Sequence, residues 1–353
     1  MNGLFKAAKA SLFETRGLGL FSAVASSGWR SRRLLILCYH GIAMGAEHDS
    51  HPAMFLPAEI FERRLATLKD FRANVLDLGD GLRRLQSGTL PPRAVAITFD
   101  DGWADFYVNA YPALRKFGFP ATVYLSTYYC FNNRPVYHFA LRHMMWKQRE
   151  QRIEGHRLAF LPQVLNFRTE EDRTRVLRSI QDHVRARGLS DHERDDLVAE
   201  FADVIGFDYS ELTSHRLFHL MNPEEVAETA AGGVDIQLHT HRHQTPAERS
   251  SFVQEIQQNR QYITELTGNK NLIHFCYPSG ANQPNFLTWL REAGVESATT
   301  CHQDYASQQS NPLLLPRLLD QSGISDREFE AWLTGFMALM PKRTVEYPEV
   351  APV

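Results

Sequence analysis

The sequence is poor in cysteine, with only four residues in 353, and no two of them form a C-x-x-C pair: Cys38, Cys130, Cys276 and Cys301. This spacing argues against a cysteine-based zinc cage and against a disulfide-rich secreted scaffold. Cys38 and Cys276 lie in apolar or aromatic strings, which are typical of buried free thiols. We therefore predict a cytoplasmic protein, with contact to a membrane as an added feature and export as the alternative.

The chain also lacks an excess of charge of one sign. Its 38 Lys and Arg residues against 41 Asp and Glu residues give a net charge of −3. A balanced chain has no surplus of cations for a phosphate backbone, so nucleic acid is not an expected partner. Hydrophobic residues at 43% and charged residues at 22% are ordinary for globular proteins, which excludes wholesale disorder.

Long apolar runs are missing near the N-terminus. The uncharged run at 17–29 is shorter than the ~20 residues of a spanning helix, and it contains Gly and Ser. We interpret residues 1–33 as an N-terminal leader, helical in part, that touches a membrane or a partner. The three arginines within 30–33 favour an anionic surface. A signal peptide with a cleavage-like sequence at 23–25 is the alternative.

Short apolar runs alternate with helical periodicity in two parts of the chain, which predicts an α/β fold with a parallel sheet. In the first part, 34–130, we expect strands at 34–38, 75–78, 94–99 and 121–126, with helices at 57–71, 80–86 and 111–117. In the second part, 222–320, we expect strands at 234–238, 273–277 and 313–319, with helices starting at Asn222 and spanning 252–266 and 286–293.

The segment 131–221 between these parts shows little strand signal and is predicted to be a charged helical insertion. Thr169 with Asp172, and Ser190 with Glu193, have the spacing of helix N-caps. A lid or a packing subdomain is the plainest interpretation of this insertion. Residues 321–353 are expected to form a C-terminal helix and tail.

Two motifs whose side chains are suited to catalysis or metal binding follow predicted strands, at the end where α/β folds place their sites. The first is Asp100-Asp101 before Gly102. Adjacent buried carboxylates are costly unless they are paired or bind a cation, although a plain Asp-Gly turn is the alternative.

The second motif is HTHRH at 239–243, which follows an apolar strand and is hard to explain as core packing. His239 and His243 are four residues apart and can converge over one turn. Imidazoles combined with a carboxylate oxygen suit zinc or a similar metal. His241 is expected to point away from the metal, and it is the alternative if one of the other two histidines is not a ligand.

Five segments occur in the order of a known family: ILCYHGI (36–42), AVAITFDDG (94–102), YPALRKFGFPATVYLS (111–126), HTHRH (239–243) and FCYPSG (275–280). In these segments the chain resembles the polysaccharide deacetylases of the NodB-homology type, carbohydrate esterase family 4. The resemblance covers 34–128 and 222–320. It implies an irregular (β/α) barrel, with seven strands, whose halves are separated by the helical insertion.

The resemblance also implies roles for individual residues. Asp101, His239 and His243 would hold a divalent metal, with zinc as the expected ion. Asp100 would be the general base, and a backbone N–H near Ser279 would help to form an oxyanion hole. The implied reaction removes an N-acetyl group from an amino sugar in a polysaccharide or glycolipid, and Thr240 would steady the histidine loop.

The sequence departs from the family pattern at two points. Cys276-Tyr277 occupies the stretch where the third signature carries an arginine, and Arg317 is the candidate replacement, with a structural ion pair as the alternative. The late Leu-x-x-His-Asp signature, which supplies a general acid in many members, has no clear match. His40 is the best candidate for the acid or for substrate contact, and a buried, hydrogen-bonded histidine is the alternative.

Other side chains have plainer interpretations. His138 and His143 are candidates to line a cleft, while His48 and His51 are expected to be exposed in a polar loop. An aromatic wall from 131–137 and Trp146 is less favoured than core packing. Deformylation or O-deacetylation of a sugar and a catalytically silent glycan-binding module remain alternatives. Asp100 argues against the module, because binding needs no base beside a metal ligand.

Overall fold

The computed structural model describes residues 19–340. The first part of the expected leader, 1–18, and the expected tail, 341–353, lie outside the described residues.

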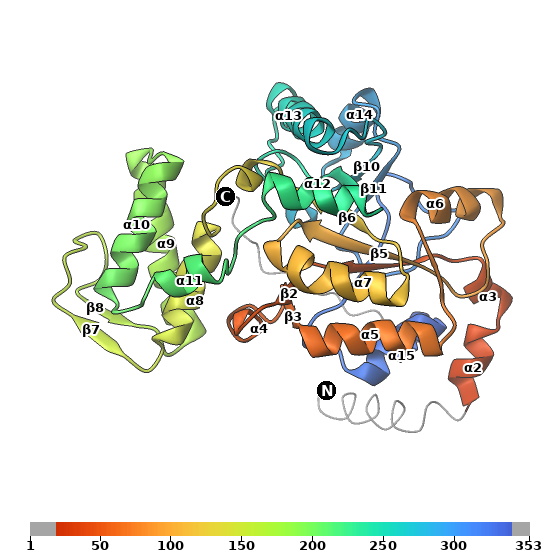
Figure 1. Cartoon of the computed structure of the whole chain (residues 1–353), viewed down its shortest axis with the longest axis horizontal. Coiled ribbons are helices and arrows are strands. Elements are labelled where there is room, and N and C mark those ends of the chain that lie inside the picture. The colour runs from red at the N-terminus through yellow and green to blue at the C-terminus, as the bar shows by residue number, and fades with distance from the viewer. Residues whose placement is uncertain (1–18, 341–353) are drawn as a thin grey trace.

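A curled parallel sheet forms the centre of the molecule, as the sequence predicts (Figure 1). Neighbouring strands pair in parallel along the whole path. The order is β11 (Ser297–Thr299), β10 (His274–Cys276), β9 (Asp235–Leu238), β6 (Thr122–Leu125), β5 (Ala94–Asp101), β1 (Leu35–Tyr39) and β12 (Leu318–Leu319), with β4 (Asn74–Leu76) beside β5.

The two ends of this path meet through the segment that leads into β12. Thr299 of β11 bridges Leu315 in parallel, and the Leu315 N–H donates to the carbonyl of Ala298 at 2.9 Å or less. Three residues later, Leu318 pairs with Leu37 of β1. The seven strands of this path therefore form an irregular barrel, with β4 as an eighth strand of the sheet beside β5, and the predicted fold class is confirmed.

Complete burial explains why the strands read as continuous apolar runs. Every residue of β1 and β5 is buried, and Tyr39 pairs with Phe99 where the two strands lie side by side. Helices surround the sheet, and Figure 1 shows α13 and α14 flanking its β10–β11 end. They are α5 (Ala58–Asp70), α6 (Leu78–Ser87), α7 (Tyr111–Phe117), α12 (Pro223–Ala231), α13 (Arg249–Thr267), α14 (Pro284–Glu292) and α15 (Asp326–Thr334).

The local signals for these helices are visible in their caps. Asn222 forms a capping box with Glu225 at the start of α12, and Gly268 ends α13 in the left-handed conformation. A π-helical turn, Phe106–Ala110, precedes α7 and comes after the short connection that follows the Asp100-Asp101 strand end. Such turns are frequent near functional sites.

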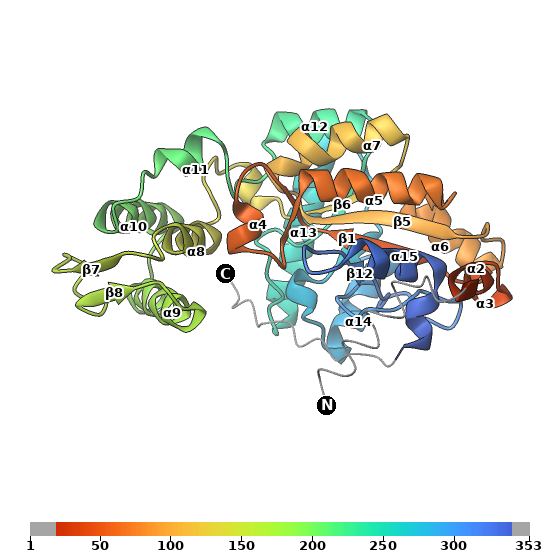
Figure 2. The ribbon, with the colours of Figure 1, turned by 90° about the horizontal axis from the view of Figure 1, so that it is seen from below.

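The insertion forms a lobe beside the barrel (Figures 1 and 2). It contains α8 (Tyr137–Lys147), α9 (Glu170–Arg187), α10 (Asp191–Val204) and α11 (Ser210–Ser214). It also contains an antiparallel pair, β7 (Arg152–Glu154) and β8 (Val164–Asn166), which the sequence pattern does not predict. Strands of three residues are too short to show an alternation, and Leu165 is the only buried residue in them.

A short excursion after β1 connects the barrel to the insertion. It consists of β2 (Gly41–Ala43), α4 (Glu47–Ser50) and β3 (Phe55–Pro57), and α4 contacts α8. His51 is buried here among Phe55, Phe139 and Phe218, so the expectation that it is exposed is wrong. The loop is polar in sequence, but the first helix of the insertion covers it.

The segment 19–33 packs on the C-terminal helix. It contains α2 (Leu20–Ala25) and α3 (Gly28–Ser31), and the ring of Phe21 lies 4.9 Å from that of Phe336. Arg30 is fully buried and donates to the carbonyls of Leu333 and Ala94. Among the described helices, none combines the length and the apolar character needed to span a bilayer.

Candidate active site

The side chains suited to catalysis and metal binding lie together at the carboxyl ends of the barrel strands. Asp100 and Asp101 end β5, His239 follows β9, and Cys276 ends β10. His40 follows β1, which is the neighbour of β5. Parallel strands bring their carboxyl ends to one edge, so residues far apart in sequence meet there.

Three side chains converge in the way that the resemblance implies for the metal ligands. Oδ1 of Asp101 lies 3.1 Å from Nε2 of His239 and 3.2 Å from Nε2 of His243. Two ligand atoms ~2.0–2.1 Å from a tetrahedral zinc ion are about 3.3 Å apart. The donor atoms and their spacing therefore fit a divalent metal with three protein ligands.

Strained backbone sets up this convergence. Asp101, Thr240 and His243 all have positive φ angles, of 71°, 63° and 56°. Left-handed backbone in residues other than glycine costs of order 1–3 kcal/mol and concentrates at functional sites. At Asp101 it turns the second carboxylate out of the strand alternation, which otherwise would point it away from Asp100.

Hydrogen bonds fix which atoms of these side chains are available. Nδ1 of His239 donates to the carbonyl of Cys276 at 2.8 Å, which leaves Nε2 with its lone pair toward Asp101. Nε1 of Trp103 donates to Oδ2 of Asp101 at 2.9 Å, which leaves Oδ1 for a ligand. Nearby histidines hold the pKa of Asp101 well below its usual range although burial opposes this, so it is an anionic donor at neutral pH.

The histidine loop is anchored from behind. The N–H of His239 donates to Oδ1 of Asn259 on α13, and the N–H of Gln244 donates to the Thr240 hydroxyl. His241 turns away, with its ring stacked on Tyr262 and its Nδ1 2.9 Å from the Thr127 hydroxyl. The loop therefore presents His239 and His243 and withholds His241, as expected.

Asp100 is held by Arg317, the residue proposed as the replacement for the family arginine. Nη1 and Nη2 of Arg317 donate to the two carboxylate oxygens, each at 2.7 Å. Both side chains are almost fully buried. Burial by itself would raise the pKa of Asp100, but the guanidinium charge and its hydrogen bonds lower it well below the usual range. Asp100 is therefore an ionised carboxylate at neutral pH.

Two thiols complete the surroundings of Asp100. Sγ of Cys276 lies 3.3 Å and Sγ of Cys38 3.5 Å from Oδ2 of Asp100. Groups that combine these thiols with Asp100 and a histidine have a metal-compatible spacing too. Arg317 already occupies both oxygens of Asp100, so electrostatics favours the metal at Asp101 instead.

His40 faces the same carboxylate from the other side. Its Nε2 lies 3.8 Å from Oδ2 of Asp100. Burial lowers the pKa of His40 below its ordinary value, although the nearby Asp100 and Asp101 partly oppose this. His40 is thus a neutral imidazole in the resting site, and its side chain is partly exposed beside Asp100.

Ser279 lies on the turn that follows β10. Its φ of 55° places it in the left-handed region, and it is exposed in a 3-10 turn, Pro278–Gly280. Among the described residues, the Ser279 N–H has no acceptor in the backbone hydrogen bonds. This is compatible with the predicted donor role toward a substrate oxygen.

Sequence reasoning missed several contributors. Asn259 and Trp103 hold the ligands, and Cys276 contacts the proposed base, but the motifs assign none of these roles. Trp103 had one available signal, since it directly follows Asp-Asp-Gly. His143 was a cleft candidate, but it is buried against Ser50 at the contact between α4 and α8.

Comparison with known proteins agrees with this geometry. The family model for polysaccharide deacetylase matches residues 87–161 and 207–298. The poly-beta-1,6-N-acetyl-D-glucosamine N-deacetylase of Staphylococcus aureus is 40% identical over 67 residues, which are 19% of this chain and 23% of that protein. The Bacillus subtilis protein YxkH is 32% identical over 105 residues, 28% of this chain and 36% of that protein.

Solved structures support the same fold. The deacetylase PplD of Streptococcus pyogenes, solved with acetate, has a TM-score of 0.55 at 19% identity and matches 84% of this chain and 96% of that one. IcaB from Ammonifex degensii has a TM-score of 0.53 at 17% identity, with 86% and 97% matched.

These findings confirm the family that the motifs indicated: the chain belongs to the polysaccharide deacetylase family. The matched stretches span well under two thirds of the length of the curated relatives.

Proposed function

We propose that this protein is a metal-dependent hydrolase that removes N-acetyl groups from an amino sugar in a polysaccharide or glycolipid. One observation carries the proposal. An ionised aspartate, Asp100, is fixed by Arg317 directly beside a convergent set of Asp101, His239 and His243. A glycan-binding module has at most a use for the convergent ligand set, whereas hydrolysis needs the ligand set and the base Asp100 together.

The residues of the chain divide the reaction between them. A divalent metal held by Asp101, His239 and His243 would polarise the acyl carbonyl and make the attacking water more acidic. Asp100 takes the proton of that water as its oxygen attacks the carbonyl carbon. The Ser279 N–H donates to the oxyanion that develops. His40, whose Nε2 lies 3.8 Å from Asp100, takes up the proton that Asp100 has accepted and passes it to the nitrogen as the C–N bond breaks. The products are acetate and a free amine.

The name of the staphylococcal relative supports the choice of the acyl group and of a first substrate. The site geometry does not discriminate an acetamide from a formamide or an O-acetyl ester, since the same residues serve each carbonyl. Sugar deformylation and O-deacetylation are therefore outcomes of the test. The silent glycan-binding module is less favoured because it gives Asp100 and Arg317 no task.

Acetate release from β-1,6-linked N-acetylglucosamine oligomers, with zinc supplied, tests the reaction. We expect release by the wild-type protein and a loss of at least about 100-fold in Asp100→Asn, which keeps the shape of the side chain but cannot accept the proton. Formate release or release from O-acetylated sugar in place of acetate would replace the proposed acyl group. Full activity of Asp100→Asn would overturn the assignment of the base.

Metal content tests the ligand set separately. His239→Ala is expected to lose most of its bound zinc on elemental analysis, because only two of the three protein ligands are left to hold the ion. His241→Ala is the matched control in the same loop, and it should retain zinc because that ring faces Tyr262. Equal zinc content in the two variants would show that the metal lies elsewhere.

For location we propose the cytoplasm, with contact to a membrane through the N-terminal leader, and export as the alternative. The free thiols of Cys38, Cys130, Cys276 and Cys301 support a reducing setting. Burial of Phe21 and Ala25 supports retention of the segment that a signal peptidase would remove.

A further inference from the structure

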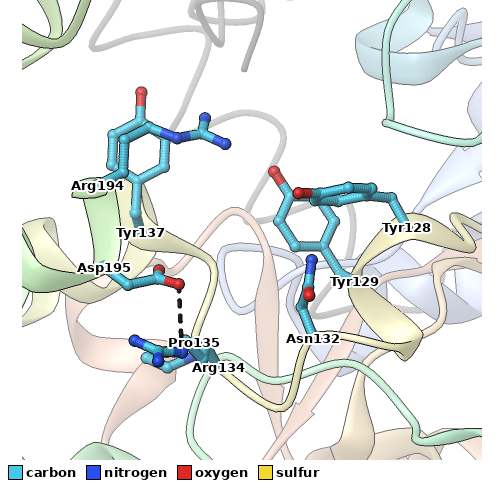
Figure 3. Close-up of a pocket in the computed structure, with 8 residues that line it drawn as sticks. All are labelled: Tyr128, Tyr129, Asn132, Arg134, Pro135, Tyr137, Arg194 and Asp195. Atoms are coloured by element: carbon cyan, nitrogen blue, oxygen red, sulfur yellow. Dashed lines mark ion pairs between the residues drawn. The ribbon is translucent and has the colours of Figure 1, made fainter. Parts of the chain in front are cut away.

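A pocket with tyrosine walls lies where the barrel meets the insertion (Figure 3). The space between its side chains, open solvent included, is about 320 Å³. Two of its walls come from different parts of the chain: Tyr128 and Tyr129 follow β6, whereas Tyr137 begins α8 and Arg194 lies on α10. Asn132, Arg134, Pro135 and Asp195 complete the lining.

Both walls are joined to the active site. The N–H of Tyr128 donates to the carbonyl of His241 at 2.8 Å, so one wall is bonded to the loop that presents His239 and His243. On the other wall, Tyr137 is followed by His138, which lies near enough to His243 and Asp101 for their charges to affect its pKa. Nε2 of His138 is buried and has no hydrogen-bond partner among the described residues. The pocket walls are thus one hydrogen bond and one residue removed from the groups around the proposed metal site.

The lining has the chemistry that proteins use to hold sugars. Tyrosine rings offer flat apolar faces to the C–H groups of a pyranose, and their hydroxyls, with Asn132, offer polar partners. Two arginines and one aspartate are the charged residues of the lining. Arg134 pairs with Asp195 at 3.4 Å, and the guanidinium of Arg194 lies over the ring of Tyr137 at 5.3 Å. Three of the eight lining residues are tyrosines, whose ring faces pack on the C–H groups of an uncharged sugar, and this favours a neutral pyranose as the ligand.

We propose that this pocket is a glycan subsite that binds a neutral pyranose of the same chain, one or more residues away from the sugar being deacetylated. The inference rests on the proposed function for its substrate class. It gives the insertion a task in selecting substrate, since Tyr137, Arg194 and Asp195 all belong to it. The consequence is a preference for oligosaccharides over short substrates.

Binding measured without turnover tests the subsite. Zinc-loaded Asp100→Asn protein is titrated calorimetrically with a dimer and a hexamer of β-1,6-linked N-acetylglucosamine. We expect the hexamer to bind more tightly than the dimer. Adding Tyr128→Ala should weaken hexamer binding about tenfold and leave dimer binding unchanged, because only the longer chain reaches the pocket.

Two further variants guard against a folding artefact. Asn132→Ala truncates a partly exposed polar side chain in the pocket and should weaken the hexamer selectively. Phe131→Ala is the control, because this ring is 48% exposed beside Tyr262 and outside the pocket lining. It should bind both oligomers as the parent does.

The outcomes separate the subsite from the activity. Equal binding of dimer and hexamer, no binding of either, or hexamer binding that is unaffected in both Tyr128→Ala and Asn132→Ala would overturn the subsite. Selective binding of oligogalacturonate would overturn the assignment of a neutral sugar. If the Tyr128-dependent binding occurs but the wild-type protein releases no acyl group, the subsite stands and the proposed reaction fails.

Discussion

Asp100 and Asp101 are neighbours in the chain, yet their surroundings give them different partners. Asp100 keeps the strand conformation and faces the guanidinium of Arg317. Asp101 takes a left-handed φ and faces the imidazoles of His239 and His243. Two carboxylates in one buried edge remain ionised because each has its own cationic or metal-binding environment.

Removing the cation from Asp100 should change the pH dependence of activity. In Arg317→Gln, burial acts on Asp100 without the opposing charge, so the pKa of Asp100 rises and the base becomes protonated at higher pH. We expect the acid limb of the kcat/KM profile to move to higher pH, with a loss of about 100-fold at neutral pH. A pH–rate profile measures both effects.

Arg317→Lys is the matched variant, since it keeps the charge and loses the two-point geometry. It should retain the position of the acid limb better than Arg317→Gln while losing part of kcat. An unchanged profile in Arg317→Gln would show that Arg317 has a purely structural role.

At the scale of elements, the segment 19–33 behaves as part of the barrel. Arg30 is the buried residue of α3 and donates to three carbonyls, those of Arg33, Ala94 and Leu333. It thereby connects the start of the described chain to β5 and α15. Its burial lowers the pKa of this guanidinium to about 10, which still leaves it charged at neutral pH.

Arg30→Met should therefore destabilise the whole domain. The substitution fills a similar space but leaves buried carbonyls without donors, which costs about 2–4 kcal/mol in the free energy of unfolding. Urea denaturation measures this loss. Arg32→Met is the control on the exposed side of the same segment, and it should change the free energy by less than about 0.5 kcal/mol. Equal effects of the two variants would contradict the anchoring role.

The helices and strands differ in how well they can be predicted from their local sequences. The fully buried β1 and β5, and the capped helices α12 and α13, follow from short apolar runs and from capping residues. The three-residue pair β7 and β8 and the π-helical turn before α7 do not, because their hydrogen bonds depend on neighbours rather than on a periodic pattern.

At the scale of the molecule, the insertion docks on the barrel through a buried pair of histidines. The Ser50 hydroxyl lies 2.9 Å from Nδ1 of His51 and 2.8 Å from Nδ1 of His143. Burial, reinforced by Lys147, lowers the pKa of His143 to about 4, against an ordinary value of 6.5. The folded protein therefore disfavours a proton that the unfolded chain accepts.

This linkage predicts an acid-sensitive fold. The stabilisation from a neutral His143 is fully present above pH 6.5 and is lost as the pH falls toward 4. Between pH 8 and pH 5 the loss attributable to this histidine is about 2 kcal/mol. Urea denaturation of His143→Gln should show a pH dependence that is smaller by that amount. His192→Gln, on the exposed surface of α10, is the control and should leave the pH dependence unchanged.

The sequence alone determined the fold class, the order of most strands and helices of the barrel, and the residues of the proposed metal site. It could do so because buried parallel strands appear as apolar runs in the sequence, and because the candidate catalytic and metal-binding residues lie where those strands end. It also indicated Arg317, through the absence of an arginine near Cys276.

Only the tertiary structure decided what lies around those residues. Asn259 and Cys276 act on the site from elements far apart in sequence, so no local pattern could assign their roles. Trp103 is a close neighbour in sequence, but only the folded backbone shows that its indole N–H reaches Asp101. The burial of His51 and the tyrosine pocket arise where the insertion meets the barrel. Contacts of that kind depend on how two separately encoded surfaces pack, and packing is decided by shape in three dimensions rather than by spacing along the chain.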